Sequence, residues 1–283
     1  MKTAPFSAHT YDLAIIGGGV VGASLAIAAG DAGFDTLLLD ASPLKSNTSD
    51  DFDGRAFSIS IGCWRMWRVV GVADALEKTA QPIVGVQAES ELGRRLIIDQ
   101  SDTNTAEEPL GYMVEHRHIQ RTLDEALAAR DSITVRRGAP LTHLDVANGV
   151  VRVGSSDFRA EARIIVGCDG ANSAVRSASG IRLHGHDYAA TALAASVQLE
   201  NDHQGAARQV FLKTGPLAVL PLPDNRANII WTEPKDTAET LEAMRDQDFE
   251  AELRLRAGDF IGPFELIGHR FAYPLSLRMA ESF

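Results

Sequence analysis

The chain has 283 residues, of which 45% are hydrophobic and 23% are charged, and its net charge is −11. These values are typical of a globular protein of about two domains, and an acidic balance without a basic tract argues against nucleic acid as a partner. Cys63 and Cys168 are too few for a disulfide framework, so we expect a reducing compartment, with the cytoplasm as the default.

The first predicted unit is a strand, a glycine turn and a helix. An apolar run at 11–16 leads into the pattern G-x-G-x-x-G, whose glycines are Gly17, Gly19 and Gly22. In a dinucleotide-binding unit the first glycine allows the tight turn. The second lets the backbone approach a pyrophosphate, and the third lets the helix pack against the strand. The pattern therefore predicts a nucleotide site here.

A second apolar run, 36–39, completes this unit and ends at Asp40. Asp40 follows the glycines by about twenty residues, where a carboxylate can accept a hydrogen bond from a ribose hydroxyl. The helix that begins near Val20 presents free N–H groups and a positive dipole end to phosphates.

The uncharged stretch 13–30 is long enough to suggest a membrane span. Five of its residues are glycine and it divides naturally into a strand and a helix. A buried strand–helix unit is the better interpretation.

The middle of the chain continues with a polar loop at 41–54 and a helix in which Trp64, Trp67 and Val70 are spaced three apart. This spacing favours a packed face over a binding site. A helix is predicted at 116–130, and Asn148-Gly149 predicts a tight hairpin.

The C-terminal part changes to a run of strands. The expected strands are 187–199, 207–213, 217–221 and 227–233, followed by helices at 236–245 and 248–256 and an extended segment at 268–275.

A second motif follows an apolar strand at 163–166. Asp169 projects from the end of that strand, Gly170 permits a sharp exit from the sheet, and Ser173 can cap the next helix. An ordinary strand-to-helix turn would look similar. Its occurrence together with the glycine turn favours a binding role.

The chain resembles the flavoprotein aromatic hydroxylases, the para-hydroxybenzoate hydroxylase class of FAD monooxygenases. Four motifs match that pattern in order, at 17–22, 53–55, 115–119 and 167–176. Within the class, segments 57–60, 215–222 and 273–275 look most like the ubiquinone-biosynthesis hydroxylases. The similarity covers essentially the whole chain.

The resemblance implies an α/β fold with a discontinuous Rossmann-like FAD-binding domain and a β-rich substrate domain. The expected FAD-binding domain comprises 1–78, 110–186 and 272–283, and the expected substrate domain comprises 79–109 and 187–271.

The resemblance also implies roles for particular residues. Gly17, Gly19, Gly22 and Asp40 would hold the ADP part of FAD, and Arg117 would pair with the pyrophosphate. The remaining implied contacts are Val20 in the glycine turn, Asp169 and Gly170 on the ribityl side, and Arg55 near the isoalloxazine.

On the residues alone, Arg55 and Arg117 are equally compatible with surface cations, because exposed arginine is common. The pairs His116/His118 and His184/His186 have no companion cysteine or carboxylate set, so we expect no metal site.

The implied reaction is hydroxylation of the aromatic ring of a polyprenylated ubiquinone precursor, with FAD as cofactor, NAD(P)H as co-substrate and O2. The cofactor carries this chemistry, so we nominate no side chain as catalytic. Two alternatives stay open. One is a hydroxylase or halogenase of another aromatic compound, and the other is a non-catalytic assembly subunit with the same fold. Peripheral association with the inner membrane, with a biosynthetic complex or with a second copy is compatible with the family.

Members of the family continue beyond the segment that resembles 271–275, with a Gly-Asp motif and a further loop that contact the flavin. This chain ends at Phe283, before them. From the sequence we expect a truncated form that holds FAD weakly and lacks hydroxylase activity.

Overall fold

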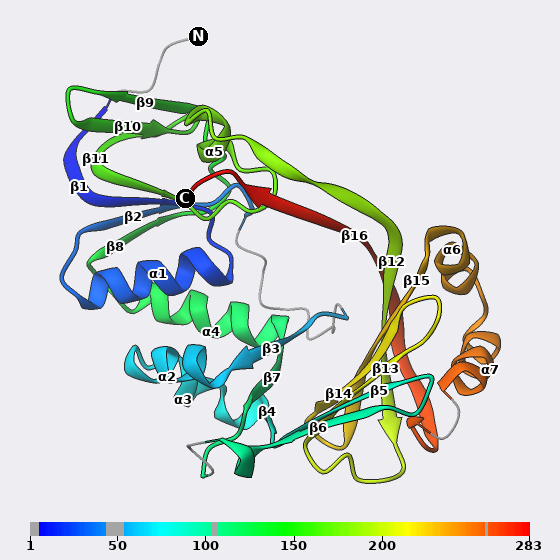
Figure 1. The fold of residues 1–283 in the computed structure, drawn as a ribbon. Helices are drawn as coiled ribbons and strands as arrows, with labels where there is room; N and C mark the ends of the chain where they lie inside the picture. Colours follow the sequence, from blue (N-terminus) through cyan, green and yellow to red (C-terminus); the bar gives the residue numbers. More distant parts are fainter. Residues whose placement is uncertain (1–5, 44–53, 104–106, 258–259) are drawn as a thin grey trace.

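The computed structural model describes residues 6–43, 54–103, 107–257 and 260–283. Two large sheets dominate the molecule, and the long strands β12 (Leu183–Leu199) and β16 (Phe264–Ala280) run from the neighbourhood of the first into the second (Figure 1). Strands and helices thus form an α/β part joined to a mainly β part, as the sequence predicts.

The first sheet has six strands in the order β8-β2-β1-β11-β10-β9. Strands β8, β2, β1 and β11 are parallel, and β10 and β9 are added antiparallel. Their bounds are β1 Phe6–Ile16, β2 Thr36–Leu39, β8 Ile133–Arg136, β9 His143–Ala147, β10 Val150–Gly154 and β11 Arg159–Gly167.

Helices α1 (Val20–Asp31) and α4 (His116–Ala128) lie together on one side of this sheet (Figure 1). Below them lie the short helices α2 (Ile61–Val69) and α3 (Val72–Leu76), which the 3-10 turn η1 (Glu77–Thr79) follows. The predicted packed face on α2 is confirmed, because Trp64 and Trp67 are each 2% exposed. The Trp67 indole N–H donates to Ser24 Oγ at 2.9 Å, so burial of the ring leaves no polar atom unpaired.

The second sheet has seven strands in the order β16-β12-β15-β14-β13-β5-β6. Its remaining strands are β5 Gly85–Ser90, β6 Arg95–Asp99, β13 Ala206–Phe211, β14 Pro216–Leu222 and β15 Arg226–Pro234. Helices α6 (Lys235–Glu242) and α7 (Asp246–Ala257) lie against its outer side (Figure 1). The Trp231 and Phe249 rings pack there 5.8 Å apart. The predicted run of strands and the two predicted helices are therefore confirmed.

A three-stranded sheet, β3 (Ala56–Ser60), β7 (Gly111–Glu115) and β4 (Ala80–Ile83), lies between the two large ones. The remaining short elements are α5 (Ala174–Ala178) and the 3-10 turn η2 (Gln100–Asp102).

Local turn chemistry follows the sequence closely. Asn148 and Gly149 both have positive φ, at 57° and 76°, as the predicted hairpin turn requires. The first strand begins earlier than predicted, at Phe6, because its backbone pairs with the start of β11. The uncharged stretch 13–30 is divided between β1 and α1. Within the described residues, no helix combines the length and the apolar character that crossing a bilayer needs.

Candidate cofactor-binding site

The glycine turn joins β1 to α1 at the carboxyl edge of the parallel sheet. Gly17 has φ +103°, and its N–H donates to Leu39 O at 2.7 Å. A Cβ on Gly17 would lie 2.3 Å from Cys168 O, and a Cβ on Gly22 would lie 1.8 Å from Gly17 O. Only glycine fits at these two positions, so the turn, the helix and β11 can pack closely.

Gly19 differs, because a Cβ there would meet nothing within 4 Å. Gly19 is the N-cap of α1, and no side chain caps that helix end. Val20 opens the helix, and Val21 beside it is 71% exposed. The start of α1 therefore borders open space, and the free N–H groups of a helix N-terminus suit a phosphate group.

Asp40 follows β2 and lies against the same turn. Its Oδ2 accepts from Gly18 N, and its Oδ1 accepts from Ser42 N at 2.6 Å. Arg137 Nη1 lies 3.3 Å from Asp40 Oδ2 and donates to Gly18 O at 3.0 Å. Asp40 is thus fixed beside the glycines with lone pairs left for a ribose hydroxyl.

Sequence reasoning missed Arg137, which also pairs with Asp124 of α4. A signal existed, because Arg137 directly follows β8, a strand parallel to β2 that ends at the same edge of the sheet.

Asp169 stands at the end of β11, next to the glycine turn. Gly167 pairs with Ile16, and Cys168 N donates to Ile16 O at 2.6 Å. Asp169 Oδ2 caps α5 by accepting from Ala174 N at 2.6 Å. Its Oδ1 is buried and has no hydrogen-bond partner among the described residues. An orphaned acceptor at this edge is what a cofactor hydroxyl would satisfy.

The neighbours of Asp169 favour structural roles. Gly170 has φ +78°, which allows the chain to turn away from the sheet. Burial raises the pKa of the Cys168 thiol, and the Asp169 carboxylate raises it further. The thiol therefore stays protonated at neutral pH and is a poor nucleophile.

The second candidate cluster surrounds Glu115, at the end of β7. Arg55 lies beside it in the backbone, because Arg55 O accepts from His116 N at 2.9 Å. The Glu115 side chain is 1% exposed, and its Oε2 accepts from Arg117 Nε at 2.6 Å. The Arg117 side chain is 24% exposed, so Arg117 is a partly buried cation held by a buried carboxylate. Asp53, the first residue of the 53–55 motif, lies outside the described residues.

Glu115 also bonds to the second large sheet. Arg226 Nη1, at the start of β15, lies 2.9 Å from Glu115 Oε1 and forms an ion pair with it. The sequence patterns assign no role to Glu115 or Arg226. Their pairing joins the helix that carries Arg117 to the β-rich sheet.

Burial lowers the pKa of His118, which lies 3.6 Å from Glu115. Glu115 opposes this shift, whereas Arg117, Arg121 and Arg226 add to it. His118 is therefore neutral in the folded chain at neutral pH.

Because the folded-state pKa is lowered, the unfolded chain binds more protons below about pH 6.5, and stability falls as the pH falls through that value. We expect His118→Gln to lose less stability than the unmodified chain between about pH 7.5 and about pH 5. Urea unfolding at several pH values measures the free energy of unfolding of both proteins. The same dependence of that free energy on pH in the two proteins would contradict the prediction.

Two other features lie apart from this edge. A cleft of about 770 Å³ is lined by β5, β6, β13 and the end of α7, and none of the nine predicted cofactor residues lines it.

Within the described part of the chain, no three metal-ligating side chains form a cluster.

The open helix N-terminus at Gly19, the fixed carboxylate of Asp40 and the unpaired oxygen of Asp169 meet at one edge of a parallel sheet. This arrangement defines a dinucleotide-binding protein. The chain belongs to the family described as FAD binding domain, which matches residues 10–282. FAD is therefore its cofactor, and the resemblance drawn from the sequence motifs is confirmed.

Two curated relatives illustrate the similarity. The chain is 34% identical over 274 residues to the ubiquinone hydroxylase UbiL of Rhodospirillum rubrum, covering 96% of this chain and 63% of that protein. It is 30% identical over 253 residues to the 3-demethoxyubiquinol 3-hydroxylase of Escherichia coli, covering 86% and 62%. The chain thus spans less than two thirds of either relative.

Among solved structures, the p-nitrophenol 4-monooxygenase PnpA of Pseudomonas putida superposes with a TM-score of 0.72 at 18% identity. The match covers 96% of this chain and 69% of that one. At this identity the likeness concerns the fold.

Proposed function

We propose that this protein is an FAD-dependent monooxygenase that hydroxylates the aromatic ring of a polyprenylated ubiquinone precursor, with NAD(P)H and O2. The observation that carries the proposal is the 34% identity with a ubiquinone hydroxylase over 96% of the chain. The glycine turn and the orphaned Asp169 oxygen support the cofactor part of it.

FAD, when bound, would supply the electron transfer and the reaction with O2. The residues that would hold it are those at the sheet edge. The N–H groups of Gly19 and Val20 would bind the pyrophosphate, Asp40 would accept from the ribose, and Asp169 with Gly170 would serve the ribityl side. Gly17 and Gly22 would let the backbone of the turn come close to the pyrophosphate. Arg117 would add charge at the pyrophosphate, and Arg55 would lie near the isoalloxazine.

The face of the seven-stranded sheet opposite α6 and α7 is the proposed substrate wall. Asn228 is fully buried there, and its amide Nδ2 donates to Gly54 O at 3.3 Å. Gly54 has φ +79°, and a Cβ on it would lie 2.1 Å from the Phe271 ring. The corner that precedes Arg55 is therefore clamped against this face. A substrate ring bound on this face beside the corner would be shielded from water.

We propose the same division into two domains that the sequence suggests. The six-stranded sheet with α1 and α4 would form the FAD-binding domain, and the seven-stranded sheet would form the substrate domain. Strands β12 and β16 run across the proposed boundaries at 186/187 and 271/272, so the two domains would share them. Peripheral attachment to the cytoplasmic face of the inner membrane would give access to a polyprenylated substrate.

Two measurements test the proposed function. The chain is mixed with excess FAD, passed through gel filtration and examined for the visible flavin band. The protein is then given a short-chain polyprenyl phenol, NAD(P)H and isotopically labelled O2. We expect one labelled oxygen atom in the product, found by mass spectrometry. A flavoprotein that never oxygenates such phenols would refute the substrate assignment but leave FAD binding intact.

A further prediction concerns Arg117. A charge-assisted bond to a phosphate contributes about 1.5–3 kcal/mol. Arg117→Ala should therefore raise the FAD dissociation constant by about tenfold or more, measured by titration. Arg117→Lys is the companion variant, because it keeps a cation for both Glu115 and the phosphate and should therefore retain more of the affinity than Arg117→Ala. If Arg117→Ala changes the FAD dissociation constant by less than about twofold, Arg117 does not bind the pyrophosphate.

A further inference from the structure

Strand β6 is the outermost strand at one end of the seven-stranded sheet. All five of its residues are exposed, including Leu96 at 59%, Ile97 at 62% and Ile98 at 40%. A free strand edge with apolar side chains is a template for pairing with another strand. Three consecutive aliphatic residues exposed on such an edge indicate a site where another strand can pair.

The direction of the free backbone groups follows from the hairpin that joins β5 and β6. Ser90 N donates to Arg94 O at 2.9 Å at the hairpin end, and Gln100 N donates to Val84 O at 2.9 Å at the other end, so even-numbered residues face each other as hydrogen-bonded positions. In an antiparallel ladder such pairs alternate, so the even-numbered residues of β6 bond to β5. The N–H and C=O groups of Arg95, Ile97 and Asp99 therefore point away from the sheet.

An independent contact agrees with this direction. Asp99 N donates to Asp102 Oδ2 at 2.9 Å, outside the β5 ladder. The outward edge of β6 thus offers the complete N–H and C=O groups of Arg95 and Ile97, together with the C=O of Asp99.

We propose that β6 pairs with β6 of a second copy of this chain, antiparallel about Ile97, so that the two seven-stranded sheets become one continuous sheet. The segment Arg-Leu-Ile-Ile-Asp is self-complementary in this register. Ile97 faces Ile97 of the second copy, Leu96 faces Ile98, and Arg95 faces Asp99 at both ends. The outward-pointing residues are also those that the register pairs by hydrogen bonds, as a two-fold axis requires.

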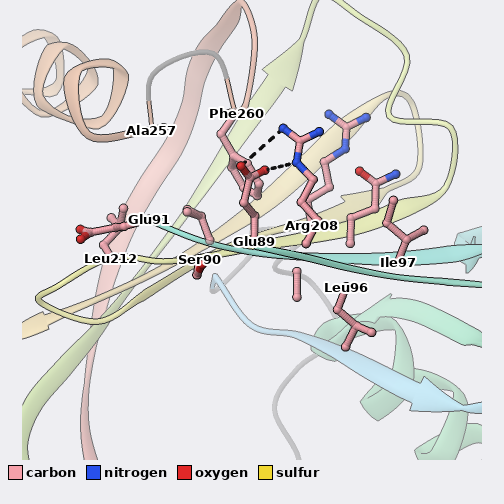
Figure 2. A pocket seen from close by; sticks show the side chains of 13 residues that line it. Glu89, Ser90, Glu91, Leu96, Ile97, Arg208, Leu212, Ala257 and Phe260 are labelled. Atoms are coloured by element: carbon pink, nitrogen blue, oxygen red, sulfur yellow. Dashed lines mark hydrogen bonds and ion pairs between the residues drawn. The ribbon is translucent and has the colours of Figure 1, made fainter. Parts of the chain in front are cut away.

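The side chains support the same register. Figure 2 shows Ile97 on the face of the sheet that carries Glu89 and Arg208, and Leu96 on the opposite face. Arg95 Nε donates to Oε2 of Glu89, which lies on that face, at 2.9 Å, and the Arg95 side chain stays 68% exposed. Its guanidinium has N–H groups to spare for a carboxylate of the second copy.

The Asp99 carboxylate is also held in a fixed position and in its charged form. Its Oδ1 accepts from Ser101 N at 2.9 Å and from Ser101 Oγ at 2.8 Å. These bonds hold the pKa of Asp99 below its usual value, so the carboxylate is charged at neutral pH. An opposite-charge pair directly across two strands is stabilising, and a like-charge pair there is destabilising.

The pairing involves only five residues on each side, so the interface is small. Interfaces well below about 1,200 Å² belong to weak or transient complexes. We therefore expect a reversible dimer whose population rises with protein concentration, visible by sedimentation velocity across a dilution series.

The first variant tests the backbone pairing. Ile97→Pro removes an N–H that the parent sheet does not use, and proline is tolerated where the N–H of an edge strand faces solvent. The variant should keep the circular dichroism spectrum and lose the dimer. Association equal to that of the unmodified chain would overturn the proposal.

The second pair of variants tests the register. Arg95→Asp places two carboxylates opposite each other at both ends of the dimer, and Asp99→Lys places two cations there. Each protein alone should dimerise at least about tenfold more weakly than the unmodified chain.

A mixture of these two variants should form a one-to-one dimer. At one end of that dimer the introduced carboxylate of the first variant faces the introduced ammonium of the second. At the other end the unmodified Asp99 of the first variant faces the unmodified Arg95 of the second. Failure of the mixture to associate would rule out this register.

Amide exchange separates the remaining possibilities. Protection of the Ile97 amide should rise with concentration, whereas Leu96 and Ile98 stay protected by β5 at all concentrations. Protection of the Ile97 amide that does not change with concentration would show that the edge is covered within a single copy. That result would overturn the proposal, as would a chain that stays monomeric throughout the series.

Discussion

Replacement of Glu115 by alanine is expected to destabilise the fold by about 3–5 kcal/mol, the largest effect of any single substitution considered for this chain. Glu115 is buried and carries the only carboxylate that the described structure places against both Arg117 and Arg226. Its removal takes away the buried carboxylate that lies beside two guanidinium groups, whose side chains are only 24% and 21% exposed. Urea unfolding measures the loss directly.

Glu108→Ala is a matched control, because Glu108 also faces two arginines, Arg65 and Arg68. That cluster is open to solvent, where ion pairs contribute little. Glu115→Ala should therefore unfold at a clearly lower urea concentration than Glu108→Ala. Equal midpoints for the two variants would mean that burial of the Glu115 cluster does not matter to stability.

Gly22→Ala is the second substitution with a large expected effect. The added Cβ would lie 1.8 Å from Gly17 O and 3.0 Å from Cys168 Cβ, so α1 must move away from the turn. Overpacking of this kind costs about 1–3 kcal/mol. We expect a loss of stability of that size together with weaker FAD binding.

Two other glycines give sharp controls. Gly62 is also near the start of a helix, but a Cβ there meets nothing within 4 Å. Gly62→Ala should be neutral or slightly stabilising, because alanine suits a helix better than glycine. Gly19→Ala should cost less stability than Gly22→Ala, because the loss is only that of an N-cap glycine, and it should reduce FAD affinity because its Cβ would occupy the open space in front of the helix. Unchanged stability and affinity in Gly22→Ala would argue against the glycine motif.

The elements that could be predicted from sequence are those whose cause is local. The glycine turn was predictable because Gly17 has a positive φ, +103°, and because a Cβ on Gly22 would lie 1.8 Å from Gly17 O, five residues earlier in the chain. The hairpin at Asn148-Gly149 was predictable because its turn needs two residues with positive φ. The change in composition after residue 187 predicted the run of strands. The family resemblance then gave the order of the motifs.

The Glu115 cluster could not be read from the chain in this way. A carboxylate two residues before Arg117 is compatible with a solvated turn, and nothing near it in sequence points to Arg226 of β15. Arg137 likewise reaches Asp40 and Gly18 only because β8 and β2 lie side by side.

The sequence by itself therefore determined the local conformations and the class of cofactor, because turn geometry and helix termini depend on residues a few positions apart. Only the tertiary structure decided which charges are buried together and which strand is left at an edge. Burial and ion pairing depend on sheet order, which joins segments far apart in the chain. The strand Arg-Leu-Ile-Ile-Asp reads as an ordinary strand until its place at the end of the seven-stranded sheet leaves one side of its backbone unpaired.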